Sequence, residues 1–469
     1  MSKMIVSNTA QLTLVLSNPG AHLPARHLAR FIDQAVEQLD LSEIQEREKR
    51  QSERGRSNYD PVMLTKLVIY GYCTGIVSER DIEEAVRERF DFNFLAGGRS
   101  PDSTKIGKFR LRNLAALANL YQPVLKMAVE AGLVDLKVVA IDGTKMLADA
   151  SRHKAMSIDR LRLACRKLPK EIAKITRQQK RLSPRSSKWK KLVEDLEFKT
   201  ARFETVKQAK IDLEERMKEE GKRKALEKAQ EAALEKAQEA ALKQTKRKTK
   251  AGKKTQNQAK ENANKTKPKE SKPQINFTDK ESRIMKMGNG WGQCYNAQAA
   301  VDRKAQIIVA QTVTNETNDK QQWEPNLKAV GENLGLMPDN SLGDAGYFSE
   351  SNVTSPALAS TNALIPPNRQ RHGEQRTTSV GRIPKSLSIA EKMRRKLQTK
   401  EGQMLYAMRK STVEPVYGQI KAGKQRFRQF SFRGLTKVRQ EWALISSGHN
   451  LTKIFRSGWQ FQQTQPLAA

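Results

Sequence analysis

Cysteines, long apolar runs and acidic residues are all scarce in this sequence. Its three cysteines, Cys73, Cys165 and Cys294, are far apart and show no CxxC or Cys/His spacing, so neither a zinc site nor a disulfide framework is indicated. No segment approaches the roughly 18 apolar residues of a membrane span, and no basic segment followed by an apolar run marks a signal peptide at the N-terminus. We therefore expect a cytoplasmic protein with no membrane contact.

The shortage of acidic residues leaves a large positive charge. The chain of 469 residues has 51 Asp and Glu against 86 Lys and Arg, a net charge of +35. An excess of this size is the electrostatic footprint of a protein that neutralises phosphates, and only part of it lies in one low-complexity segment. A nucleic acid is the expected partner, in preference to a membrane surface, an acidic protein or a charge run that serves only solubility.

Residues 1–130 are predicted to form an all-α N-terminal domain. Asp60 followed by proline predicts a capped helix start, and Ser78 begins a second helix with a capping box. A third helix carries Arg110 and Arg112. Short helices with basic side chains suit a DNA-reading domain, but they suit any small helical bundle equally well.

A long charged insertion is predicted over residues 158–275. The octapeptide ALEKAQEA occurs at 225–232 and again at 233–240, so its leucines are eight residues apart and drift around a helix. We expect residues 158–245 to form a long charged helix or an antiparallel helical hairpin. Residues 246–275 form a Lys-rich linker whose composition cannot support a core and predicts disorder, with a phosphate-binding tail and a solvated spacer as the two interpretations.

The rest of the chain predicts an α/β domain in two pieces, 131–157 and 276–461. A β-branched run at 137–142 predicts a buried strand that delivers Asp142 to its end or just inside it. The elements expected after the insertion are strands at 295–301, 305–313, 341–344 and 362–365, with helices at 319–334 and 349–358. Three strands before the first helix, in a mixed five-stranded sheet, is the element order of ribonuclease-H-like domains.

Carboxylates at the strand ends suggest a metal site. Ribonuclease-H-like sites gather three carboxylates around two divalent ions about 4 Å apart, and oxygen ligands favour Mg²⁺ or Mn²⁺. Asp142 and Asp344 lie on strands that are neighbours in such a sheet, whereas Asp302 is expected at the far end of its strand as a turn residue. Asp149 and Asp319 have helix-cap or loop interpretations.

Two glutamates compete for the third position, Glu414 and Glu441. Glu414 is favoured because Lys410 precedes it, and Lys421 follows it, on one helical face. Pro415 disfavours helical geometry at Glu414, so the helix either begins at this residue or is kinked there. Downstream, residues 418–456 carry nine Lys or Arg and one acidic residue, interleaved with aromatic residues that either stack on bases or pack the helix.

The chain resembles bacterial insertion-sequence DDE transposases of the IS4/IS5-like group. The resemblance rests on YDPVMLTKLVIYGYCTGIVSERDIEEAVRERFDFNFLAGG at 59–98, VVAIDGTK at 138–145, TDKESRIMK at 278–286, YNAQAAVD at 295–302, DAGYFSE at 344–350 and the segment from VEPVYGQIK to ISSGHNL. It implies Asp142, Asp344 and Glu414 as the catalytic, metal-binding triad and residues 1–130 as a DNA-binding domain. It also implies two Mg²⁺ or Mn²⁺ ions, double-stranded DNA as inverted repeats and target, a homodimer on paired ends, and a nucleoid-associated location.

Many such enzymes share the signature Y-x2-R-x3-E-x6-K. Here Tyr406 and Arg409 are followed by Glu414 one residue later than in that pattern, and Lys421 keeps its spacing. The extra residue is expected to turn Arg409 away from Glu414 and to place Lys410 beside it. The residues expected to contact DNA are Tyr406, Arg409, Lys410, Lys421, Lys424, Arg426 and Arg433.

Two other functions are compatible with parts of the sequence. One is a catalytically inactive DNA-binding protein derived from a transposase, although all three carboxylates are present. The other is a charged RNA-binding or scaffolding protein, which rests on residues 158–274 alone. Metal-dependent cleavage distinguishes the expected enzyme from both.

Overall fold

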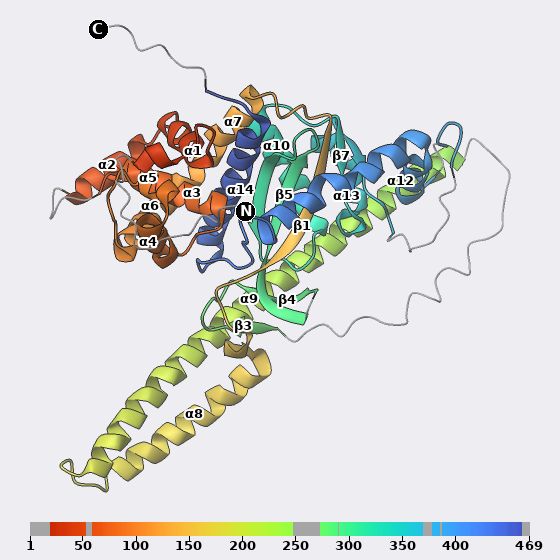
Figure 1. The fold of residues 1–469 in the computed structure, drawn as a ribbon. Coiled ribbons are helices and arrows are strands. Elements are labelled where there is room, and N and C mark those ends of the chain that lie inside the picture. The colour runs from red at the N-terminus through yellow and green to blue at the C-terminus, as the bar shows by residue number, and fades with distance from the viewer. Residues whose placement is uncertain are drawn as a thin grey trace, which may run out of the picture.

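The structure is a computed structural model that describes residues 19–52, 59–246, 273–288, 290–368, 378–384 and 387–461. A helical N-terminal region lies on one side of a mixed β-sheet, and a long helical hairpin projects away from both (Figure 1). The expected α/β class, with helices first and a mixed sheet after them, is confirmed in outline.

The N-terminal region consists of short helices joined by tight turns. Their bounds are η1 Pro19–His22, α1 Leu28–Glu37, α2 Ser42–Ser52, α3 Pro61–Thr74, α4 Glu79–Glu88, α5 Phe90–Leu95, α6 Ser103–Asn119 and α7 Tyr121–Glu130. The predicted cap of α3 is confirmed, because the Asp60 carboxylate accepts hydrogen bonds from the backbone N–H groups of Val62 and Met63 at 3.0 and 3.3 Å. Ser78 does precede α4, but its side chain makes no capping bond, so the capping box is wrong.

The basic residues of α6 are engaged inside the protein. Arg110 is 3% exposed and pairs with Glu79 at 2.6 Å, and Arg112 pairs with Glu48 at 2.6 Å. A buried guanidinium held by a carboxylate, such as that of Arg110, is not available to read a base edge. Arg112 is 34% exposed, and its pairing with the buried Glu48 also stabilises the helical region.

The sheet is built on β1 and its two neighbours. The strand bounds are β1 Val138–Leu147, β4 Arg283–Met287, β5 Gly290–Asp302, β6 Ile308–Thr314, β7 Asn340–Leu342 and β8 Asn362–Leu364. The strands pair in the order β4-β5-β1-β7-β8, and β6 also pairs with β5. β5 is antiparallel to β1 and β6, whereas β7 is parallel to β1 and β8. If β4 is left out, the order across the sheet is β6-β5-β1-β7-β8. Numbered along the sequence, these are the third, second, first, fourth and fifth strands.

The sheet differs from the prediction in three respects. It has six strands because β4 was missed, β1 continues five residues beyond Asp142, and β7 ends at Leu342 instead of reaching Asp344. The extra length of β1 arises because its whole second half pairs with the long strand β5, down to Leu147 opposite Cys294. Asp142 therefore lies within a strand, and Asp344 lies in the turn after one.

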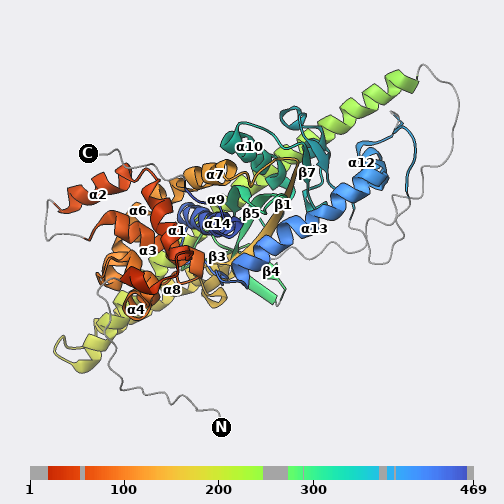
Figure 2. The same cartoon turned by 45° about the horizontal axis from the view of Figure 1, so that its top comes forward.

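Helices cover both the sheet and the N-terminal region. Their bounds are η4 Lys320–Gln322, α10 Trp323–Leu334, η5 Ala345–Tyr347, α11 Glu350–Thr354, η6 Pro356–Leu358, α12 Ile389–Gln398, α13 Lys400–Lys421 and α14 Leu435–Ser457. Helix α13 crosses β1 in both views, and α14 lies between the sheet and helices α3, α6 and α7 (Figures 1 and 2). The buried residues of α14 join the helical region and the sheet in one apolar core.

The insertion is an antiparallel helical hairpin, which confirms one of the two predicted forms. It consists of α8 Ile158–Gln179 and the first part of α9 Ser187–Lys246, and the short antiparallel strands β2 Ala155–Ser157 and β3 Gln274–Asn276 pair at its base. The predicted disorder of 246–275 falls mostly on residues outside the described ranges.

Among the described helices, none is by itself long and apolar enough to span a membrane, and only α3 and α4 together, bent by 99°, meet that criterion of length and composition.

Candidate functional site

The pairing of β1 with β7 brings two of the predicted carboxylates together. Ala140 stands opposite Leu342 in a parallel register, so Asp142, two residues further along β1, and Asp344, in the turn two residues after the end of β7, come to the same edge of the sheet. The two carboxylates are close enough for the charge of Asp344 to raise the pKa of Asp142. Gly143, the next residue of β1, is required at its position, because a Cβ atom would lie 2.1 Å from Nε2 of Gln298.

Asp142 has the chemistry of a cation ligand. Its side chain is 22% exposed, and burial raises its pKa to about 6. The Arg409 guanidinium opposes this rise in the pKa, and the nearby Asp344 carboxylate adds to it. The hydroxyl of Tyr417 donates to the Asp142 carbonyl and so fixes this part of β1 against α13. Two carboxylates that disfavour each other's charge are an arrangement that a bound cation stabilises.

Glu414 is carried by a helix that continues through proline. Helix α13 runs from Lys400 to Lys421 with Pro415 inside it, so the alternative in which the helix begins at Glu414 is wrong. Proline removes the backbone N–H that would bond to the carbonyl of Ser411, four residues earlier. The side chain of Gln306 donates to this carbonyl at 3.0 Å instead. Glu414 therefore sits in mid-helix, with its side chain 55% exposed.

Arg409 lies between the carboxylates. Its Nη1 atom is 3.2 Å from Oδ2 of Asp142, and its Nη2 atom is 3.8 Å from Oε1 of Glu414. Burial lowers the pKa of Arg409, but the surrounding groups, Asp142 foremost, raise it more, so the net shift is upward. The expectation that Arg409 would be turned away from Glu414 is wrong, because the long Arg409 side chain reaches across the helix to it, and Lys410 is exposed.

Two more signature residues lie close to this site. Tyr406 is partly buried near Arg409 and Asp344, and burial raises the pKa of its hydroxyl. Lys421 donates from Nζ to the hydroxyl of Thr144 and to the Lys145 carbonyl, the latter at 3.0 Å. Burial lowers the pKa of Lys421. Lys421 thus connects α13 to the part of β1 that follows Asp142.

The remaining predicted DNA contacts lie on the surface beyond α13. Lys424 and Arg426 are exposed, and Arg433 is exposed and paired with Asp149 at 2.9 Å. The aromatic residues between them are mostly interior: Phe427, Phe430 and Trp442 are at most 4% exposed. These three rings pack the core and do not stack on bases.

Asp319 is the site residue that sequence reasoning assigned to a cap or a loop. It does precede η4, but its Oδ1 atom accepts hydrogen bonds from Asn296 at 2.6 Å and Gln298 at 2.7 Å, and lies 3.4 Å from Nζ of Lys145. Its charge also contributes to the raised pKa of Asp142. The sequence contains one signal for this contact, the polar pair Asn296 and Gln298 within an otherwise apolar strand. Buried amides need hydrogen-bond partners, and Asp319 supplies the acceptor for both.

Glu441 has a structural role. It is fully buried, and its carboxylate accepts hydrogen bonds from the Tyr72 hydroxyl at 3.2 Å and from the backbone N–H groups of Ser431 and Phe432 at 2.9 and 3.3 Å. Burial raises its pKa, and the Ser431 hydroxyl and Arg110 partly oppose this. Glu441 thereby connects α3, the segment before α14, and α14 itself.

Replacing Glu441 by Ala is expected to lower the free energy of unfolding by about 2–4 kcal/mol, because several buried donors lose their acceptor. The midpoint of urea unfolding measures this loss. Glu332→Ala, at an exposed position of α10, is the matched control and should leave the midpoint unchanged. A Glu441→Ala protein as stable as the control would contradict this role.

The fit of the site to divalent ions depends on Arg409. The donors are hard carboxylate oxygens of the kind that Mg²⁺ and Mn²⁺ prefer, and Asp142 of β1 lies close to Asp344 in the turn after β7. Within the described ranges, however, no three His, Cys, Asp or Glu side chains are close enough together to hold one ion. The carboxylates thus fit in kind, and Arg409 currently supplies the positive charge between two of them.

Two family models match parts of the chain. A family model described as "Transposase domain (DUF772)" matches residues 17–112, and a model described as "Transposase DDE domain" matches residues 368–455. The second match contains Arg409, Glu414 and Lys421, and Asp142 and Asp344 lie outside both. No curated protein and no solved structure matches the chain. The two matches, at opposite ends of the chain, indicate a transposase of the DDE type.

Proposed function

We propose that this transposase cuts DNA at the ends of its element and joins those ends to target DNA, with Asp142, Asp344 and Glu414 as the catalytic carboxylates. The observation that supports this best is the parallel pairing of β1 and β7, which leads Asp142 and Asp344 to one edge of the sheet, where α13 packs on β1 and the charge of Asp344 acts on Asp142. The strand order also supports a ribonuclease-H-like classification of this domain.

In this proposal the three carboxylates hold two Mg²⁺ or Mn²⁺ ions. When bound, the ions activate the attacking water or 3′-hydroxyl and stabilise the leaving oxygen. The residues of α13 do the rest. Tyr417 and Lys421 keep β1 fixed beneath the helix, and Arg409 pairs with the carboxylates of Asp142 and Glu414 until an ion takes its place.

DNA would approach over the surface that continues from the end of α13. The exposed cations Lys410, Lys424 and Arg426 are placed to hold phosphates there, and Arg433 becomes available if DNA displaces Asp149. Two element ends must be cut together, which favours a homodimer on paired ends, acting on bacterial DNA in the cytoplasm.

An assay of end cleavage and strand transfer tests the proposal. Purified protein is incubated with Mg²⁺ or Mn²⁺ and with a duplex that carries the inverted repeats flanking the gene. Wild-type protein should nick the duplex at the repeat boundary, and Asp344→Ala should not. Undiminished cleavage by Asp344→Ala would contradict the assignment of the triad. Binding without metal-dependent cleavage by the wild type would favour the inactive transposase-derived protein instead.

A further inference from the structure

The positive charge of the helical hairpin is concentrated at its far end. Residues 166–191, which comprise the end of α8, the turn and the start of α9, contain eleven Lys or Arg and one Glu. The remainder of α9, residues 192–246, contains thirteen basic and thirteen acidic residues. The hairpin therefore has a strongly basic tip, which we define as residues 166–191. The remainder of α9, residues 192–246, has no net charge, and we call it the balanced shaft.

The basic residues of α8 share one face of the helix. Leu161 and Leu168 pack against α9, in a small core of their own. Lys167, Lys170, Lys174, Arg177 and Arg181 recur at intervals of three and four residues. This spacing aligns them on a face turned away from the apolar one, over a length of about 21 Å at 1.5 Å per residue.

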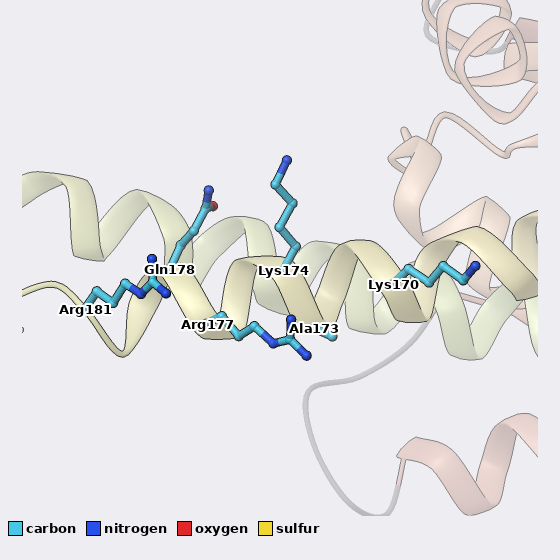
Figure 3. A pocket seen from close by; sticks show the side chains of 6 residues that line it. All are labelled: Lys170, Ala173, Lys174, Arg177, Gln178 and Arg181. Carbon is cyan, nitrogen blue, oxygen red and sulfur yellow. The ribbon is translucent and has the colours of Figure 1, made fainter.

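This basic face has no internal compensation. The one acidic residue of the tip, Glu171, pairs with Lys199 of α9 at 2.7 Å. Lys170, Lys174, Arg177 and Arg181 are exposed and line a surface pocket of about 440 Å³, and none of them pairs with a carboxylate of the described chain (Figure 3). Like charges three and four residues apart destabilise a helix, so a purely solvated face gains nothing from this pattern. A polyanion would offset the repulsion.

The hairpin is fastened to the catalytic part of the molecule. Asp212 of α9 pairs with Lys280 at 2.8 Å, and Arg223 pairs with Glu316 at 2.6 Å. Arg216 also donates to the Gln274 carbonyl at 2.7 Å. The 25 residues of helix between Asp212 and the start of α9 at Ser187 extend about 37 Å, which equals roughly eleven base pairs of duplex. The tip is thus held about one turn of DNA away from its attachment to the sheet.

We propose that the hairpin tip is a second binding surface for duplex DNA, which holds the phosphate backbone about one helical turn from the place where the hairpin is attached to the sheet. The proposal rests on the proposed function for the identity of the polyanion. Contacts from Lys and Arg to phosphates carry no sequence information, so this surface adds affinity and orientation, and it does not select the inverted repeat.

The test is a comparison of two variants with equal reduction of charge. The tip variant carries Lys174→Gln, Arg177→Gln and Arg181→Gln. The control carries Lys207→Gln, Lys218→Gln and Lys222→Gln, at exposed positions of the balanced shaft. Fluorescence anisotropy in EDTA measures binding to a duplex without inverted repeats, between about 50 and 200 mM salt.

The tip variant should bind about tenfold or more weakly at low salt, and its plot of log K against log salt should be shallower by about 0.9 for each phosphate that the variant no longer neutralises. The control should behave as the wild type. Equal binding by both variants, or an equally large decrease in both, would overturn the proposal. If the tip variant loses helicity, Arg177→Glu alone repeats the test. Cleavage by the wild type and by Asp344→Ala is measured in parallel. If the wild type does not cleave but the tip variant alone binds DNA more weakly, the catalytic assignment is rejected and the DNA-binding surface at the tip is retained.

Discussion

Replacing Asp142 by Asn is expected to lower metal-dependent DNA cleavage by about a thousandfold or more. The substitution keeps the shape of the side chain and removes the charge that holds a divalent ion, which contributes several kcal/mol to stabilisation of the transition state, at about 1.4 kcal/mol per factor of ten. The measurement is the single-turnover rate of end cleavage under saturating Mn²⁺. DNA binding in EDTA should remain as in the wild type.

The stability of the same variant in EDTA should change relative to the wild type in two ways: a loss that does not depend on pH, because Arg409 is left without its counter-charge, and a gain that appears as the pH rises. The folded pKa of Asp142, about 6, lies above that of an unfolded chain, about 3.9, so folding favours the protonated form. The stability that this group contributes is complete below about pH 4 and is lost as the pH rises through 6. Asn has no proton to lose, so the gain, about 1–2 kcal/mol, should appear at pH 8 and vanish at pH 4.

Asp339→Asn is the control for both measurements. Asp339 is an exposed residue at the start of β7, at the other end of this strand from Asp344. Its substitution should alter neither the cleavage rate nor the pH dependence of unfolding. Cleavage by Asp142→Asn within tenfold of the wild-type rate would remove Asp142 from the set of catalytic carboxylates.

The sequence correctly predicted the strands whose local residue pattern and place in the order of elements agree. The run from Val138 to Ile141 is almost completely buried, as its β-branched composition predicted, and the ribonuclease-H-like order of the expected elements led to the correct pairing of the strand of Asp142 with the strand before Asp344. The charged insertion forms a hairpin because helix breakers are few in it, with Pro169 inside α8 and Pro184 in the turn, and because apolar residues on one side of each helix let the two helices pair.

The sequence-based prediction was wrong where a contact depends on one long side chain or on a residue distant in the sequence. The helical spacing of 100° per residue places Cβ atoms, and it cannot tell where the long side chain of Arg409 ends. Pro415 was expected to disturb its helix, and the compensating donor is Gln306, which is more than a hundred residues away in the sequence. Strand β4 was missed because it pairs only with the first residues of β5, beside the exposed Trp291, so its burial pattern is weak.

Replacing Arg409 by Ala is also expected to have a large effect, on stability and on metal binding. Arg409 neutralises carboxylates that a metal ion would otherwise neutralise. Replacing Arg409 by Ala removes a guanidinium whose side chain is only 11% exposed, and it leaves Asp142 without its counter-charge. In EDTA this should lower the free energy of unfolding by about 3 kcal/mol, the usual cost of removing one partner of a buried ion pair. Thermal unfolding at pH 8 measures the decrease.

Divalent ions should restore more stability to the Arg409→Ala variant than they give to the wild type. A ligand that binds only the folded state stabilises it in proportion to the logarithm of its concentration over Kd, and in the wild type the ion must compete with the guanidinium for Asp142 and Glu414. Titration with Mn²⁺ should therefore give an apparent Kd about tenfold or more lower for the variant.

Lys410→Ala removes a neighbouring exposed cation from the same helix, so it separates this local competition from a general change in charge. It should leave both the stability in EDTA and the Mn²⁺ titration unchanged. An Arg409→Ala protein that bound Mn²⁺ no more tightly than Lys410→Ala would show that the guanidinium and the ion occupy separate places. In that case Arg409 would be a fixed part of the site, and Glu414 would have to reach the ions without displacing it.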